Sequence, residues 1–154
     1  MYCFWYNKET HQPRIVIGPD WCFCLLKIFL INMCAFAVIG ISYHVGWELL
    51  FYAMIGTTFF ENLAFGLTMC KNQGLCPRDP SIHSLTYLNK VKTLHRERYC
   101  RYCKIIARKG HKIEHCDYCD VCVEDLDHHC PWSSKCIAKG NLIAFNVFVN
   151  ALIG

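Results

Sequence analysis

The chain has 154 residues, of which 54% are hydrophobic and 14% aromatic, and its formal net charge is +4. This composition and a positive mean hydropathy favour a membrane protein over a soluble domain. The charge is lopsided, because 13 of the 16 lysines and arginines lie between Lys71 and Lys139. Seven of the thirteen cysteines lie between Cys100 and Cys136, and no cleavable signal is apparent. This pattern favours metal binding or thiol chemistry in a reducing compartment over a secreted disulfide framework.

The first half of the chain predicts a helical hairpin in a membrane. Residues 1–20 are polar in part, residues 21–45 form a long apolar run, and residues 49–70 form a second run of similar length. About 20 apolar residues are needed to cross a bilayer as a helix. Because lysine and arginine favour the cytosolic side, we expect residues 1–20 in the cytosol and residues 46–48 as a short non-cytosolic turn.

Two charged residues interrupt these apolar runs, Lys27 in the first and Glu61 in the second. Charged groups inside a membrane are costly and are often functional. The sequence leaves open whether the two form an ion pair, or whether each extends to the membrane surface or Glu61 is protonated.

The composition changes abruptly after the second run. We expect a polar cytosolic linker over residues 71–99 and a cysteine-rich domain over residues 100–140. A third apolar run covers residues 141–154, roughly 21 Å of helix, which is too short for a bilayer core of about 30 Å. These residues therefore predict the start of a third transmembrane helix that is incomplete within the sequence.

The cysteines and histidines of residues 100–136 predict two zinc sites. The segment holds seven cysteines and four histidines, and a tetrahedral structural site takes four ligands. It contains two C-x2-C pairs, whose two sulfurs can reach one ion at about 2.3 Å through a tight turn. Two sites need eight ligands, and the residues that supply them are Cys100, Cys103, His115, Cys116, Cys119, Cys122, His129 and Cys136.

Three residues of this segment are left over, namely His111, His128 and Cys130. The last two flank the candidate ligand His129 in the sequence Asp127-His128-His129-Cys130. A metal-bound residue between an imidazole and a thiol would hold a base and a nucleophile in a narrow geometry. The pattern therefore predicts nucleophilic chemistry at Cys130.

The segment HCDYCDVCVEDLDHHCPW, followed by Cys136 and Asn141-x3-Phe145, resembles the cysteine-rich domain of DHHC palmitoyltransferases. Asp79-Pro80-Ser81 is similar to their Asp-Pro-Gly motif. The resemblance implies an α-helical polytopic membrane protein with a small irregular zinc-binding cytosolic domain between the second and third spans. It also implies transfer of a palmitoyl or other long-chain acyl group from acyl-CoA to protein cysteines.

Carried over residue by residue, the resemblance divides the ligands between two interleaved structural Zn²⁺ sites. One site would contain Cys100, Cys103, His115 and Cys122, and the other Cys116, Cys119, His129 and Cys136. Cys130 would carry the acyl group, His128 would accept its proton, and Asp127 would orient the imidazole. His111 remains an alternative to His115, because the loop between Cys103 and His115 is longer than is usual in the family.

The partners that the resemblance implies are palmitoyl-CoA or another long-chain acyl-CoA, and proteins with membrane-proximal cysteines. We expect an integral protein of an endomembrane (Golgi or endoplasmic reticulum) or of the plasma membrane, and no binding of nucleic acid. The main alternative is a catalytically inactive, truncated membrane adaptor that retains the zinc domain. A membrane-anchored RING-like ubiquitin ligase is disfavoured, because RING modules close with another C-x2-C pair, whereas this domain ends Cys130-x5-Cys136.

Overall fold

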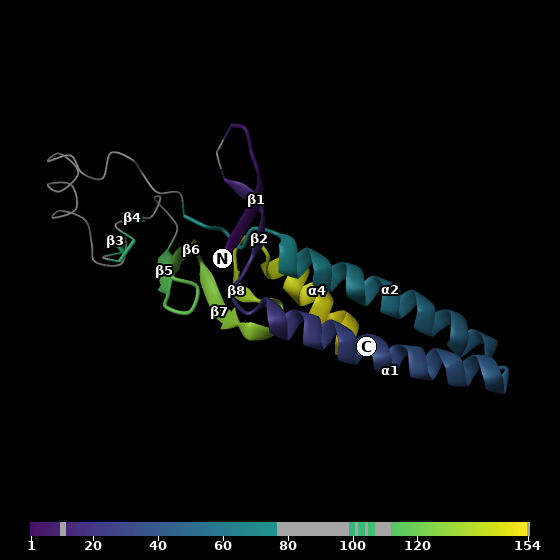
Figure 1. Cartoon of the computed structure of the whole chain (residues 1–154). Coiled ribbons are helices and arrows are strands. Elements are labelled where there is room, and N and C mark those ends of the chain that lie inside the picture. Colours follow the sequence, from purple (N-terminus) through teal and green to yellow (C-terminus); the bar gives the residue numbers. More distant parts are fainter. Residues whose placement is uncertain (10–11, 77–98, 101, 104, 107–111, 154) are drawn as a thin grey trace, which may run out of the picture.

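The computed structural model describes residues 1–9, 12–76, 99–100, 102–103, 105–106 and 112–153. The Asp79-Pro80-Ser81 segment, most of the expected linker and His111 lie outside the described residues. In the described part, a pair of long helices extends from a group of small β-hairpins (Figure 1). This combination of an α-helical part with a small cysteine-rich part confirms the predicted fold class.

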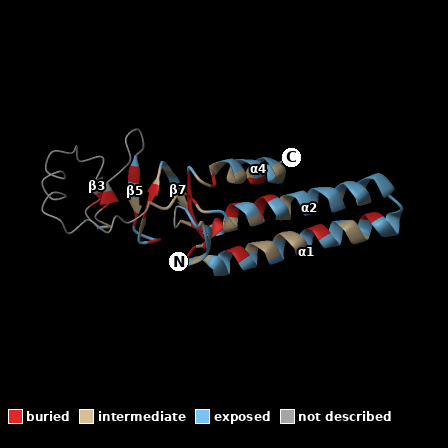
Figure 2. Ribbon diagram, turned by 90° about the horizontal axis from the view of Figure 1, so that it is seen from above, coloured by how far each residue is buried: buried red, intermediate tan, exposed pale blue. Residues whose placement is uncertain are grey.

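Helices α1 (Trp21–Val45) and α2 (Glu48–Cys70) coincide with the two apolar runs. Their connection is tight, because Gly46 adopts a left-handed conformation with a φ of 77° and Trp47 N–H donates to the Ser42 carbonyl over 2.9 Å. Both helices are long and apolar enough to cross a membrane. Much of their surface is exposed along their length (Figure 2), and a lipid environment would cover such a surface.

A pair of amides joins α1 to α2. Asn32 Nδ2 donates to Asn62 Oδ1 over 3.0 Å, and Asn62 Nδ2 donates to Asn32 Oδ1 over 3.1 Å. Each amide also donates to a carbonyl one turn earlier in its own helix, at Ile28 and Thr58, over 2.8 Å. Both side chains therefore use their donors and acceptors, as polar groups must in apolar surroundings.

Helix α4 (Leu142–Ile153) packs against α2, and the ring centroids of Phe148 and Phe65 are 5.1 Å apart. Lys27 of α1 contacts both of these rings. Its Nζ lies 4.3 Å from the centroid of Phe65 and 3.9 Å from that of Phe148. The described residues show no ion pair between Lys27 and Glu61, and Glu61 Oε1 is buried without a hydrogen-bond partner. The ammonium group thus faces two aromatic rings, which is a favourable cation–π arrangement.

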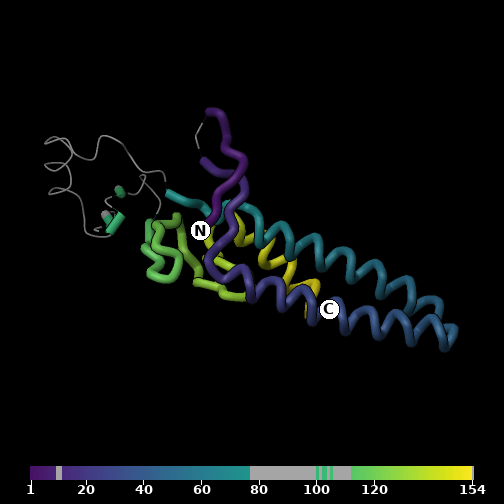
Figure 3. Tube along the Cα trace, in the orientation of Figure 1, coloured from purple at the N-terminus to yellow at the C-terminus, as the bar shows by residue number. Residues whose placement is uncertain are grey.

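The segment before α1 forms a hairpin that the sequence analysis did not predict. Strands β1 (Tyr2–Tyr6) and β2 (Pro13–Ile17) pair antiparallel. The hairpin projects sideways from the end of the helix pair (Figure 3). Strand β2 also forms a bridge between Ile15 and Lys71, the first residue after α2. The chain before α1 is therefore bound to the chain after α2.

The described part of the cysteine-rich domain is built of short antiparallel hairpins. The pairs are β3 (Tyr99–Cys100) with β4 (Ile105–Ile106), β5 (Ile113–Cys116) with β6 (Val121–Glu124), and β7 (Leu126–Cys130) with β8 (Lys135–Ala138). Strands β7 and β8 are connected by the 3-10 turn η3 (Pro131–Ser133). Their two small cores consist largely of the cysteines themselves. So few apolar side chains cannot stabilise a domain by burial alone, and such domains usually need metal or disulfide cross-links.

Two close approaches join this domain to the segment before α1. Gly18 N–H donates to Ser134 Oγ over 3.0 Å, and a Cβ atom at Gly18 would overlap the Ser134 carbonyl oxygen, so only glycine fits there. Lys135 is fully buried, and its Nζ donates to the carbonyls of Val16 and, over 2.7 Å, of Lys71. The domain is thereby fixed against the near ends of both long helices.

Candidate metal clusters and reactive thiol

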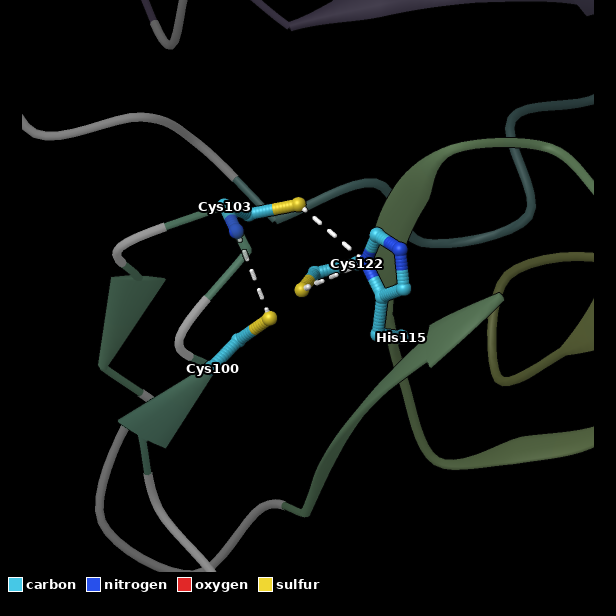
Figure 4. Close-up of side chains that lie close together, drawn as sticks. All are labelled: Cys100, Cys103, His115 and Cys122. Atoms are coloured by element: carbon cyan, nitrogen blue, oxygen red, sulfur yellow. Dashed lines mark hydrogen bonds between the residues drawn. The ribbon is translucent and has the colours of Figure 1, made fainter. Parts of the chain in front are cut away.

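The first cluster, Cys100, Cys103, His115 and Cys122, gathers residues from β3, the turn after it, β5 and β6. Its three sulfurs and the imidazole ring point toward one another (Figure 4). His115 Nδ1 lies 3.3 Å from Cys103 Sγ and 3.9 Å from Cys122 Sγ, and the four potential ligand atoms all lie within 4.8 Å of one another. Of the two histidines considered for this site, His115 is the one that the described residues contribute.

The second cluster contains Cys116, Cys119, His129 and Cys136, again with all ligand atoms within 4.8 Å. His129 Nδ1 lies 3.5 Å from Cys116 Sγ and 3.4 Å from Cys119 Sγ. The two clusters are interleaved, because His115 and Cys116 are neighbours in β5, and successive side chains of a strand point to opposite faces. The structure thus brings together all eight candidate ligands, in two groups of four.

Both clusters have dimensions that fit a tetrahedral zinc ion. Two sulfurs bound to one zinc at about 2.3 Å would be roughly 3.8 Å apart, and Cys119 Sγ lies 3.6 Å from Cys136 Sγ. A disulfide would need about 2.05 Å, and none of the thirteen cysteines forms one in the structure. Three thiolates and one imidazole are also a donor set that favours zinc and leaves no open coordination position.

The thiols in each cluster disturb one another's protonation. A hydrogen bond from the Cys136 thiol lowers the pKa of Cys119, and the same bond, together with burial, raises the pKa of Cys136. In the first cluster, burial raises the pKa of Cys122. Buried thiols packed so closely cannot all ionise unless a cation lies between them, and a divalent metal ion would supply that charge.

Each histidine of the clusters turns its second ring nitrogen toward a carboxylate. His129 Nε2 lies 3.0 Å from Asp20 Oδ2. His115 Nε2 lies 3.6 Å and 3.7 Å from the exposed carboxylates of Asp117 and Asp120. A carboxylate behind a metal-bound histidine fixes the tautomer and orientation of the ring. Sequence reasoning missed Asp20, because only the fold brings it to the domain.

A tyrosine covers one face of each histidine ring. Tyr102 stacks on His115 and Tyr118 stacks on His129, with ring centroids 4.8 Å apart in both pairs and planes inclined by 24° and 23°. Sequence reasoning missed these residues as well. The signal was available, because tyrosine is the third residue of both C-x2-C pairs, CRYC and CDYC.

Cys130 lies outside both clusters, at the end of β7, and is the one cysteine of residues 100–136 that does so. The residue is only 9% exposed. His128, two residues earlier, is on the same face of the strand, and its Nδ1 lies 2.8 Å from Asp127 Oδ2. The register of β7 against β8 shifts between Leu126 and His128, so Asp127 occupies a bulge, and a bulge commonly redirects a side chain. No hydrogen bond joins Cys130 Sγ to His128 in the described residues.

The turn after Cys130 rests on the first turns of α1. Cys24 Sγ donates to the Trp132 carbonyl over 3.2 Å. The ring of Phe23 meets that of Trp132 edge-on, with a centroid distance of 6.0 Å. The candidate nucleophile therefore lies where the cysteine-rich domain meets the beginning of the first long helix.

Asn141 and Phe145 link the second cluster to α4. Asn141 is fully buried, donates from Nδ2 to the Cys136 carbonyl over 3.1 Å, and accepts from Ala138 N–H over 2.9 Å. Phe145, in the first turn of α4, contacts the ring of His128 edge-on at a centroid distance of 5.3 Å. This pair of residues therefore orients α4 relative to His128.

Comparison with known proteins gives matches over this region and beyond it. Residues 93–153 match the DHHC palmitoyltransferase family. The chain is 26% identical to Protein S-acyltransferase 8 of Arabidopsis thaliana over 94% of its own length and 43% of that protein. It is 38% identical to Palmitoyltransferase ZDHHC9 of Homo sapiens over 47% of its own length and 19% of that protein. The chain spans less than half the length of these curated relatives.

Proposed function

We propose that this chain acts as a protein S-acyltransferase, because residues 93–153 match the DHHC palmitoyltransferase family. It would transfer a long-chain acyl group, such as palmitoyl, from acyl-CoA to cysteine thiols of other proteins. The observation that carries the proposal is the position of Cys130, a thiol outside both clusters and two residues from His128, whose Nδ1 lies 2.8 Å from Asp127.

The proposal includes a membrane, which α1 and α2 would cross and α4 would enter. The turn at residues 46–48 would lie on the far side, and residues 1–20, the linker over residues 71–99 and the domain over residues 100–140 in the cytosol. The length and apolar surface of the helices support this placement, as does the concentration of lysine and arginine after the second helix. The membrane would be an endomembrane or the plasma membrane.

The two clusters would hold two zinc ions in structural roles. Zinc would supply the cross-links that the small cores of the domain lack, and with four protein ligands in each cluster it would take no part in bond making. His129 would be held as a ligand between His128 and Cys130. The strand that carries the reacting groups would therefore be anchored at its centre.

The residues of this chain would transfer the acyl group twice, first from coenzyme A to Cys130 and then from Cys130 to a substrate cysteine. With Nδ1–H donating to Asp127, His128 keeps Nε2 free to accept the Cys130 proton. The Cys130 thiolate attacks the thioester carbon, the bond to the coenzyme A sulfur breaks, and that sulfur takes the proton from His128. A substrate cysteine then gives its proton to His128 and attacks the acyl group on Cys130. Cys130 leaves as a thiolate and recovers the proton, so the chain returns to its starting state.

Labelling with an alkyne-bearing palmitoyl-CoA tests the proposal. The reconstituted chain should acquire a label that hydroxylamine removes, because a thioester is the bond formed. Cys130→Ser should abolish the label without loss of zinc, since Cys130 lies outside both clusters. Cys34→Ser, which alters an exposed thiol of α1, is the matched control and should keep it.

Two results would overturn the proposal. A label that persists in Cys130→Ser would place the acyl group on another thiol. A folded, zinc-loaded chain that takes up no label would favour the membrane adaptor, in which the zinc domain binds partners without transferring anything.

A further inference from the structure

The hairpin β1–β2 has two unlike faces. Cys3 and Val16, which pair across the strands, lie on the face toward the cysteine-rich domain, where Val16 is fully buried and Cys3 lines a cavity with Cys103 and Cys122. Residues directly opposite each other in an antiparallel pair share a face. The other face, here named the aromatic face, consists of Tyr2, Phe4, Ile15 and Ile17.

The chain leaves the aromatic face largely uncovered. The exposed fractions of Tyr2 and Phe4 are 57% and 51%. This face continues into the surface of the long helices, because a hollow of about 270 Å³ is lined by Tyr2, Phe4, Ile17, Trp21, Leu25 and Met69. Trp21 and Leu25 belong to the first turns of α1, and Met69 to the last turn of α2. The aromatic face therefore adjoins the apolar surface of both helices at their near ends.

Hydrogen bonds fix the hairpin in this position. Asn72 Nδ2 donates to the Pro13 carbonyl over 2.7 Å, and Asn72 N–H donates to the Arg14 carbonyl over 3.1 Å. The hairpin runs across the direction of the helices (Figures 1 and 3). If the helices cross a bilayer, the hairpin lies along the bilayer surface, with its aromatic face on the side of the apolar helix surface.

We propose that the β1–β2 hairpin is an interfacial membrane anchor, whose aromatic face inserts into the leaflet that α1 enters. This inference rests on the proposed membrane placement of α1 and α2. Tyrosine and tryptophan are favoured at the level of the lipid headgroups, and the chain presents Tyr2 and Trp21 there, both exposed. The outer edge of β1 carries backbone groups that the bilayer core could not satisfy. The hairpin therefore lies at headgroup depth.

Depth-dependent fluorescence quenching tests the anchor. The four native tryptophans, Trp5, Trp21, Trp47 and Trp132, are replaced by phenylalanine, and one reporter is added to the full chain in phosphatidylcholine vesicles brominated near the headgroup or near the chain ends. The Phe4→Trp reporter should lose more intensity with the shallow bromines. A Leu30→Trp reporter, in the middle of α1, should lose more with the deep bromines. A Glu114→Trp reporter, exposed on β5, should lose none.

The reporters separate this inference from the proposed membrane placement. Quenching at Leu30→Trp without quenching at Phe4→Trp would overturn the anchor and leave the spanning helices in place. No quenching at either position would overturn both.

A second measurement keeps the native tryptophans and does not depend on their replacement. Benzoylphenylalanine at position 4 should form adducts with the mass of a phospholipid on illumination. Adducts with a second protein, or with a second copy of this chain, would show that a protein covers the aromatic face and would overturn the anchor.

Discussion

Asp20 Oδ2 lies 3.0 Å from Nε2 of His129, whose Nδ1 faces the sulfurs of the second cluster. The two residues are 109 positions apart in the chain. Asp20 directly precedes α1, and its own N–H donates to the Ser134 carbonyl over 3.3 Å. The beginning of the first long helix and the second cluster are therefore mechanically joined.

Asp20→Ala should weaken zinc binding by the second cluster. Loss of a carboxylate behind a metal-bound histidine typically lowers metal affinity by roughly 10- to 100-fold. Asp20 makes no side-chain hydrogen bond at the helix cap, so the effect on the helix itself should be small. Competition with a chromophoric chelator measures the affinity. Asp117→Ala is the matched control, because this carboxylate lies 3.6 Å from His115 and is 90% exposed; an equal loss in both variants would contradict the role of Asp20.

Gly18→Ala should separate the cysteine-rich domain from α1. The added methyl group would overlap the Ser134 carbonyl, and overpacking of this kind costs about 1–3 kcal/mol. We expect a lower unfolding temperature and slower labelling of Cys130. Gly40→Ala, where nothing lies within 4 Å of the new atom, should be neutral or slightly stabilising in a helix. A Gly18→Ala chain as stable as the Gly40→Ala chain would refute the close approach.

The Asn32–Asn62 amide pair should contribute measurably to the contact between α1 and α2. Hydrogen bonds between membrane helices contribute about 0.6 kcal/mol on average and up to about 1.7 kcal/mol. A double-mutant cycle of Asn32→Leu and Asn62→Leu, measured by unfolding in mixed micelles, should give a coupling energy in this range. Additive effects of the two substitutions would mean that the amides do not interact.

Because Lys135 is buried, the free energy of unfolding of the chain should rise with pH. Burial lowers the pKa of Lys135 from 10.5 to about 8. Between these values the unfolded chain keeps a proton that the folded chain has lost, so the free energy of unfolding increases as pH rises. Below about pH 8 both states are protonated, and the full cost of burying the ammonium, roughly 3 kcal/mol, is present.

The Lys135→Met chain separates this contribution from other titrating groups. The substitution also removes the two hydrogen bonds to the Val16 and Lys71 carbonyls, so the variant should be less stable overall. Its stability should nevertheless rise less between about pH 7 and about pH 9.5 than that of the unaltered chain. Unfolding temperatures at the two pH values measure the difference, and an equal rise in both chains would exclude Lys135 as its source.

The features predicted correctly from the sequence are those that short-range chemistry determines. The C-x2-C spacing indicates a turn with two converging sulfurs, whatever the surrounding fold. An apolar run of the length of residues 21–45 similarly predicts a helix, because the backbone has no other partners in lipid.

Other features arise from tertiary contacts that no local pattern encodes. Asp20 reaches His129 only because the domain folds back onto α1. The β1–β2 hairpin has apolar residues in both strands, but a two-stranded sheet is marginal alone and here depends on contacts with Lys71 and Asn72. No local sequence pattern marks Lys135 as a buried residue. It is buried because the fold places the carbonyl groups of Val16 and Lys71 around its ammonium group.

One peptide bond connects His115 of the first cluster to Cys116 of the second. If each cluster holds a zinc ion as proposed, loss of one ion would free its ligand in this pair of neighbours, and movement of that residue would displace the adjoining ligand of the other ion. We therefore expect a chelator to remove both zinc ions in a single cooperative step, together with the circular dichroism of the β-hairpins, because binding energy is folding energy in such domains. Two separate release steps would contradict this coupling. A cell short of zinc would accordingly contain folded and unfolded copies of the domain, and hardly any that carry one ion.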